Sequence, residues 1–302
     1  MIYTVTLNPA IDYTVWLNRS LTSGAINRTA REALRFGGKG INVSCVLREL
    51  GCRSAALGFT AGFTGEALER GLEAAGLAVD FVRVSRGMTR INVKVSADEE
   101  TEINGSGPEI TADDMEELFR RLEKIADGDT LVLSGSIPPC LPQDTYAAIL
   151  ERISDRQIRV AVDTAGEGLI RTLAYRPFLI KPNIHELGDM LGTCPSSDEE
   201  IVSCALRLQE KGAQNVLVSM GGDGALLLDE TGALHRARAH AGTVVSSVGA
   251  GDSMVAGFLA GFLESGDYEY ALRLGCAAGS ASAFCAGLAR REDIERLMLP
   301  RR

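Results

Sequence analysis

The chain has 302 residues, of which 45% are hydrophobic and 24% charged, so it can bury the core of one large or two smaller globular domains. Its formal net charge of -9 makes the protein as a whole repel polyanions, which disfavours nucleic acid and anionic membranes as partners. An anionic substrate would therefore need a local pocket of Lys, Arg or backbone N–H groups.

Short apolar, β-branched runs alternate along the chain with longer amphipathic stretches, as in βα units around a largely parallel sheet. The expected strands are Ile2–Leu7, Ser54–Phe59, Thr130–Ser134, Arg159–Val162, Phe178–Ile180, Asn215–Ser219 and Ala225–Leu228. The expected helices include Gly40–Leu50, Gly65–Ala75, Ala112–Ala126, Glu199–Lys211, Gly251–Glu264 and Tyr268–Phe284. No linker or repeat divides the chain, so we expect one α/β domain over residues 1–302.

Residues Arg90–Ala97 break this pattern, because hydrophobic and polar side chains alternate strictly. Alternation predicts a half-buried antiparallel strand, with Thr101–Asn104 returning as its partner. Tyr13–Trp16 and Arg28–Phe36 can supply further strands. We expect these pieces, inserted from about residues 10–36 and 88–106, to form a small sheet that covers the main domain as a lid.

Targeting and metal-binding signals are not apparent in the sequence. The opening MIYTVTLNPAIDYTV has neither the basic start nor the continuous apolar run of a signal peptide, and no stretch approaches the ~20 apolar residues that span a bilayer. The seven cysteines never occur as CxxC and the three histidines never as HExxH, so a zinc site has no support. We expect a cytoplasmic protein with reduced thiols.

Small polar residues and glycines follow many of the expected strands. Ligands of open α/β sheets bind outside the carboxyl ends of the strands, so these residues predict a ligand site at that edge. The strand ends concerned are Asn8–Pro9, Ser134–Ser136, Asp163–Thr164, Lys181–Asn183 and Ser219–Gly222.

The strongest local signal is the segment Val248–Ser253, which runs into an apolar helix. Its small residues allow free N–H groups at the helix N-terminus to approach an anion, and Asp252 stands beside them as a base for a hydroxyl proton. The plainer interpretation is a tight turn whose aspartate favours the start of a helix.

A second segment, Gly37–Val43, also opens a helix. It is not a Walker A loop, because no Ser or Thr follows Lys39, and it is not a dinucleotide fingerprint, because Val43 stands where a glycine belongs. Its glycines allow a ligand to touch the backbone, Lys39 supplies charge, and Asn42 can bond to hydroxyls. Taken alone, such a segment is more often only a turn.

Together these two segments resemble the two signature segments of the ribokinase/pfkB superfamily of carbohydrate kinases, in the same order and at a similar distance. LNPAID at the start, SGSIPP after residue 133, KPNIHE after residue 180 and SMGGDG after residue 218 are similar to further segments of that superfamily. The resemblance covers nearly the whole chain. It implies a ribokinase-like three-layer fold, with a mostly parallel central sheet and a β-sheet lid, and phosphoryl transfer from ATP with Mg²⁺.

The resemblance also implies roles for individual residues. Asp252 would be the base, and the anion hole would be formed by Gly249, Ala250 and Gly251. The sugar-phosphate site would be formed by Asp12, Gly37, Gly38, Lys39, Asn42, Arg90, Asn104 and Ser134. Arg28 could add positive charge for the phosphate. ATP would be bound by Lys181, Asn183, Ser219, Gly221, Gly222, Gly224 and Val248, and Mg²⁺ by Asn183 and Glu186.

The segments Thr89–Val93 and Thr101–Pro108 are similar to the phosphosugar branch of the superfamily, and Arg90 can form two charge-assisted bonds to a phosphate. The resemblance implies fructose 1-phosphate as the acceptor, with tagatose 6-phosphate or fructose 6-phosphate as alternatives. A non-catalytic sugar-phosphate sensor and a dinucleotide oxidoreductase remain as other classes. The apolar face of the lid strand, like the resemblance, predicts a homodimer formed through the lid sheets.

Overall fold

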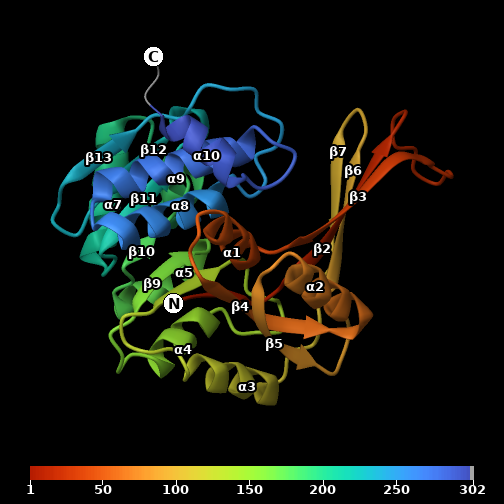
Figure 1. Cartoon of the computed structure of the whole chain (residues 1–302), viewed down its shortest axis with the longest axis horizontal. Coiled ribbons are helices and arrows are strands. Elements are labelled where there is room, and N and C mark those ends of the chain that lie inside the picture. Colours follow the sequence, from red (N-terminus) through yellow and green to blue (C-terminus); the bar gives the residue numbers. More distant parts are fainter. Residues whose placement is uncertain (300–302) are drawn as a thin grey trace.

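The computed structural model describes residues 1–299 as a nine-stranded sheet between two layers of helices, with a four-stranded sheet projecting from one side (Figure 1). The large sheet has the order β13-β12-β11-β10-β9-β8-β1-β4-β5. Seven of these strands are parallel to their neighbours, and β12 and β13 continue the sheet as antiparallel strands. Their bounds are β1 Ile2–Thr6, β4 Ser54–Ala61, β5 Ala78–Val84, β8 Thr130–Ser134, β9 Arg159–Asp163, β10 Leu179–Ile180, β11 Asn215–Ser219, β12 Ala225–Leu228 and β13 Leu234–Ala237.

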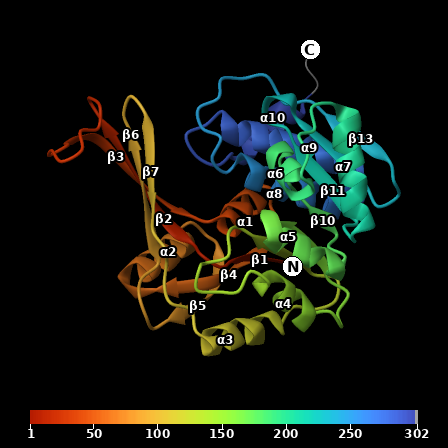
Figure 2. The same cartoon turned by 180° about the vertical axis from the view of Figure 1, so that it is seen from behind.

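Helices cover both faces of this sheet (Figures 1 and 2). One layer consists of α1 Lys39–Glu49, α2 Gly62–Ala74, α8 Ala250–Ser265, α9 Tyr268–Ala283 and α10 Arg291–Met298. The other consists of α3 Ala112–Leu122, α4 Thr145–Arg152, α5 Gly166–Thr172, α6 Ile184–Leu191 and α7 Asp198–Glu210. Two 3₁₀ turns span Leu173–Tyr175 and Gly221–Asp223.

The central strands are apolar on both faces because each face packs on a layer of helices. In β8, Leu131 and Leu133 belong to the core beneath α3–α7, whereas Val132 belongs to the core beneath α8 and α9. This explains why the strands read as continuous apolar runs rather than as alternating ones. The predicted three-layer α/β fold is confirmed.

The predicted strands and helices all form, with ends shifted by a few residues. Those not predicted are the edge strands β5 and β13 and the helices α4, α5, α6 and α10. Edge strands carry polar side chains because one side of the strand is open: β5 contains Asp80 and Arg83, which obscure its apolar pattern. A capping box begins α3, since Thr111 and Asp114 exchange hydrogen bonds there.

The second sheet contains the strands expected to form the lid, in the order β3-β2-β6-β7. Its strands are β2 Ala10–Leu17, β3 Thr29–Gly37, β6 Arg90–Ser96 and β7 Glu100–Asn104. Strand β6 pairs antiparallel with β7, as expected, and parallel with β2. The far end of this sheet projects away from the rest of the protein in both views (Figures 1 and 2).

No helix within residues 1–299 is long and apolar enough to cross a membrane. All seven cysteines lie within the same residues and are free thiols.

Candidate active site

Asp252 lies in the first turn of α8 and is only 5% exposed. The helix begins after Gly249, whose φ of 80° is in the left-handed region where glycine is favoured. A methyl group at Gly249 would also meet the side chain of Leu288 at 2.6 Å. Asn42, on α1, donates a hydrogen bond of 2.7 Å from Nδ2 to Oδ2 of Asp252. The two glycine-containing segments that the sequence singled out therefore meet at this carboxylate.

The sequence predicts an anion hole at the start of α8, and the backbone N–H groups there differ in whether they are already hydrogen-bonded. The N–H of Ala250 donates to the carbonyl oxygen of Ser247 at 3.2 Å, so it is already occupied. The N–H groups of Gly251 and Asp252 make no hydrogen bond within the described part of the chain. These two groups lie at the positive end of the helix dipole and are free to bind an anion.

A buried ionic cluster lies beside Asp252 and is centred on Asp163, the last residue of β9. Lys39 Nζ and Lys181 Nζ lie 3.4 Å and 3.3 Å from the same oxygen, Asp163 Oδ1. Lys181 also lies next to the helix start, because a methyl group on Gly251 would come within 3.2 Å of its Nζ. Lys39, Lys181, Asp163 and Asp252 thus form one group of two cations and two anions.

This cluster shifts the pKa values of its members in different directions. Burial, together with the charge of Asp163, raises the pKa of Asp252 to about 6, although Asn42 and the two lysines act in the opposite direction. Burial would also raise the pKa of Asp163, but Lys181 and Lys39 outweigh it and hold this pKa below its usual range. Asp252 is consequently poised to exchange a proton near neutral pH, whereas Asp163 stays ionised.

Several buried polar atoms near the carboxyl ends of the strands and the adjoining lid lack a hydrogen-bond partner among residues 1–299. Two are Asp163 Oδ2 and the hydroxyl of Ser134, which sits beside Asp163 in the register of β8 and β9. The others are Asn8 Oδ1, just after β1, and Asn92 Oδ1, on β6. Unpaired buried polar atoms are rare in native proteins, so their concentration here indicates a place that a polar ligand completes.

The end of the lid next to the main domain supplies a second set of polar side chains. Asp12 on β2 accepts a hydrogen bond of 3.0 Å from Asn92 Nδ2 on β6. Arg90, one pleat closer to the main domain on the same face of β6, donates from Nε to the carbonyl oxygen of Asn8 at 3.1 Å. Gly37 is required beside them, since a methyl group there would lie 2.6 Å from Asp12 Oδ2.

Two residues expected at the sugar-phosphate site are exposed on the lid. Arg28 is exposed in the loop before β3. It lies at the end of the lid where Leu17 pairs with Thr29, whereas Arg90 lies at the other end, where Ala10 pairs with Gly37. Asn104 is exposed on β7 and donates to Glu102 at 3.5 Å, although it lies opposite Asn92 in the register. Within one chain, Arg28 is too far along the lid to contact a ligand that also contacts Arg90.

The residues expected to bind ATP follow β10 and β11. Asn183 forms an isolated parallel bridge with Ser219, which keeps the two strand ends side by side. Gly221 and Gly222 face open space, while Gly224 is buried in the turn into β12 and has a φ of 91°. Val248, just before the start of α8, is 51% exposed. Gly221, Gly222 and Val248 therefore lie at the surface.

Asn183 and Glu186, the expected Mg²⁺ ligands, cap α6 in the structure. Asn183 Oδ1 accepts from Glu186 N, and Glu186 Oε2 accepts from Asn183 N, which leaves Glu186 Oε1 as the free carboxylate oxygen. No group of three or more His, Cys, Asp or Glu within residues 1–299 is placed to hold a metal. The residues present therefore fit a Mg²⁺ that takes most of its ligands from nucleotide phosphates and water, and do not fit an all-protein site.

Sequence reasoning did not assign three residues that the structure places in the site. Asp163 and Asn8 were noted only because polar residues follow their strands, and Asn92 only as part of the polar face of its strand. The signal that could have found Asp163 is a lone aspartate directly after the apolar run Val160–Val162, where the strand becomes buried. Such a charge is costly unless cations from elsewhere in the chain pair with it.

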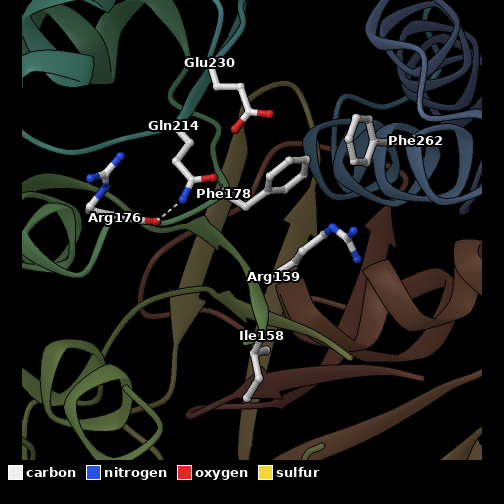
Figure 3. A pocket seen from close by; sticks show the side chains of 7 residues that line it. All are labelled: Ile158, Arg159, Arg176, Phe178, Gln214, Glu230 and Phe262. Carbon is white, nitrogen blue, oxygen red and sulfur yellow. Dashed lines mark hydrogen bonds between the residues drawn. The ribbon is translucent and has the colours of Figure 1, made fainter. Parts of the chain in front are cut away.

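A separate hollow of about 220 Å³ lies at the other end of the strands, where β9, β10 and β11 begin (Figure 3). Arg159 and Arg176 lie on either side of Phe178 there, and Gln214 donates to the carbonyl oxygen of Arg176 at 3.0 Å. None of the predicted site residues lines this hollow. The site described above is the one in which the sequence signals converge.

Residues 5–294 match the model of a family described as pfkB family carbohydrate kinase. The chain belongs to this family. A relative from Bacillus subtilis strain 168, named 1-phosphofructokinase, is 47% identical over 298 residues, which cover 99% of this chain and 97% of the relative. A relative from Bacillus licheniformis, named D-tagatose-1-phosphate kinase, is 39% identical and covers 98% of this chain and 96% of its own length.

The fold has a matching neighbour among solved structures. Phosphofructokinase-2 from Escherichia coli, in complex with fructose-6-phosphate, has a TM-score of 0.90 and 29% identity, and the match covers 98% of this chain and 97% of that one. The predicted carbohydrate kinase of the pfkB family is confirmed. The alternative of a dinucleotide oxidoreductase is wrong, because its glycine fingerprint is missing and the chain has the kinase fold.

Proposed function

We propose that the chain transfers the γ-phosphoryl group of ATP to O6 of fructose 1-phosphate, giving fructose 1,6-bisphosphate and ADP, with Asp252 as the general base. The observation that carries this proposal is the position of Asp252: a buried carboxylate with a raised pKa, beside two free N–H groups and two lysines. Residues 1–302 would act as one kinase domain, with the lid inserted from about residues 10–36 and 88–106.

In the proposed reaction, the sugar hydroxyl donates its proton to Asp252 while its oxygen bonds to the γ-phosphorus. The bond from that phosphorus to the oxygen of the departing ADP breaks. Asn42 holds the Asp252 carboxylate in one orientation, so its second oxygen can face the hydroxyl. The N–H groups of Gly251 and Asp252, with Lys181 alongside, stabilise the charge on the phosphoryl oxygens.

The lid end of the site would hold the acceptor. Arg90 provides a guanidinium for the phosphate already on the sugar, and Asp12 and Asn92 provide bonds to ring hydroxyls. Lys39 pairs with Asp163 beside Asp252, so in this arrangement it serves the phosphoryl group in transfer rather than the phosphate anchored by Arg90. The sites for the two phosphates of the product are thus supplied by different elements.

A divalent cation would be held by Glu186 Oε1 together with ATP phosphates and water, and would neutralise charge on those phosphates when bound. The capping box fixes the side chain of Glu186 at the start of α6. ATP itself would lie along the turn from Ser219 to Gly224 and against Val248, on the exposed side of the cluster.

Substrate choice is tested by comparing kcat/KM for four ketohexose phosphates with ATP. We expect fructose 1-phosphate to exceed fructose 6-phosphate and tagatose 6-phosphate by tens- to hundreds-fold. Both 6-phosphates must enter reversed to present O1 to Asp252, and each buried polar group left unpaired costs ~1–3 kcal/mol. Tagatose 1-phosphate, which differs from fructose 1-phosphate only at C4, tests the activity named for the Bacillus licheniformis relative. Any sugar that matched or exceeded fructose 1-phosphate would replace it as the assigned substrate.

The lid also supports a homodimer. Leu34, Tyr13, Val93 and Ile103 form one apolar row across all four lid strands, and Leu34 and Ile103 are 54% and 62% exposed. A second lid packed on this face would cover the row around a two-fold axis. We expect light scattering at micromolar concentration to give twice the chain mass of 32.2 kDa.

The double variant Leu34→Asp/Ile103→Asp should dissociate this dimer. Ala33→Asp, on the opposite face of β3, is the matched control and should leave it intact. A wild-type monomer with full activity would remove the proposal.

A further inference from the structure

Asp163 stands out because its full burial has no structural explanation within the sheet. Its side chain is 2% exposed, and it lies at the end of β9, where the core gives way to the site. Burying a carboxylate in such a place costs folding free energy unless a cation pairs with it. Here both partners come from other elements, since Lys39 lies on α1 and Lys181 directly follows β10. An apolar residue would fill the same space at lower cost, so the charge itself has a role.

We infer that Asp163 is a positioning residue of the transfer centre: it anchors the ammonium groups of Lys39 and Lys181 and keeps Asp252 able to take a proton. The inference rests on the proposed kinase reaction, in which Asp252 is the base.

The anchoring follows from the distances. Both ammonium groups share one oxygen of Asp163, at 3.4 and 3.3 Å, so that single atom fixes the separation of the two cations. Lys181 is 5% exposed and is held between Asp163 and the start of α8. Lys39, at 40% exposed, reaches the cluster from the solvent side and would otherwise move freely in water. Fixed donors cost no reorganisation when charge develops on the phosphoryl oxygens.

The effect on Asp252 follows from counting charges. The charged groups that act most strongly on Asp252 are Asp163, Lys39 and Lys181, and with Asp252 they sum to zero. Glu186 is a further anion near the cluster, and it acts on Lys39. Without Asp163, the two lysines would lose the anion that they share, so Asp252 would hold its negative charge more tightly and become a weaker base. Without Lys39, one cation would oppose two carboxylates, and the proton affinity of Asp252 would rise. The two changes move Asp252 in opposite directions.

This opposition gives a test that general damage to the fold cannot imitate. We would titrate the ligand-free chain by ¹³C NMR of aspartate carboxyl carbons, with the Asp252 signal assigned by its loss in Asp252→Asn. The wild-type midpoint should lie near a pKa of about 6. It should fall in Asp163→Asn and rise in Lys39→Met.

The acid limb of kcat/KM for the sugar phosphate should move in the same directions. The phosphate of the substrate also titrates near pH 6, but its contribution is the same in every variant. At pH 8, kcat of Asp163→Asn should fall about ten- to a hundredfold, because the two lysines lose their anchor.

Glu69→Gln is the matched control. Glu69 is also a buried carboxylate, 8% exposed and paired with Arg83 at 2.7 Å, but it lies on α2 outside the site. It should lose stability without changing the Asp252 midpoint or the pH profile.

An unchanged midpoint in Asp163→Asn, or a fall in Lys39→Met, would overturn the inference. If Asp163→Asn does not fold, Lys39→Met, whose side chain is partly exposed, still decides the sign. The role of Asp252 as the base has a separate test, because it would be contradicted if Asp252→Asn kept its activity.

Discussion

Asp252→Asn should lower kcat by about 10²–10⁴-fold while the chain still binds ATP and the sugar phosphate. The size of the loss is that of a general base in phosphoryl and acyl transfer. Asparagine keeps the shape of the side chain, and its carbonyl oxygen can still accept the hydrogen bond from Asn42. It cannot accept the hydroxyl proton, so binding is retained and turnover is lost.

Calorimetric binding of each substrate and single-turnover kinetics would measure the two parts of this prediction separately. Asp267→Asn provides the control, since Asp267 is also an aspartate at a helix start and accepts from Tyr270 N at 2.8 Å. It should leave kcat unchanged. If Asp252→Asn kept more than a tenth of the wild-type kcat, another group would have to be the base.

The sequence predicted the position of the site better than its internal contacts. Gly37–Val43 and Val248–Ser253 are local patterns whose geometry follows from small residues before a helix, and the structure brings them together at Asn42 and Asp252. The pairing of Lys39 with Asp163 spans 124 positions in the chain. No local pattern contains that distance, so the contact between Lys39 and Asp163 could not be predicted from the sequence.

The lid illustrates the same limit. Strict alternation in Arg90–Ala97 predicted the strand and its polar face, and both are present. Alternation does not determine register, and register decides that Asp12 lies opposite Asn92 while Arg28 lies at the remote end. Arg28 was predicted from its charge alone, whereas placing it requires counting residues along β2 and β3.

Arg90→Ala should raise KM for the sugar phosphate about ten- to 150-fold and change KM for ATP little. Loss of a charged hydrogen-bonding partner costs roughly 1.5–3 kcal/mol, and each decade corresponds to about 1.36 kcal/mol. Arg90 is half-buried at the near end of β6, and its Nε is held by the carbonyl oxygen of Asn8 at 3.1 Å. The remaining N–H groups of the guanidinium are therefore presented to a ligand in a fixed orientation.

Two further variants separate phosphate binding from support of the lid. Arg90→Lys keeps the charge but loses the planar fork, so its KM for the sugar phosphate should lie between those of the wild type and Arg90→Ala. Lys94→Ala removes a cation further along the same face of β6, where Lys94 pairs with Glu102 at 3.1 Å. If the lid only needs its charges, Lys94→Ala will behave as Arg90→Ala does. If Arg90 binds the phosphate, Lys94→Ala will leave both KM values near those of the wild type. Equal rises of KM for ATP and for the sugar phosphate in Arg90→Ala would refute phosphate binding by Arg90.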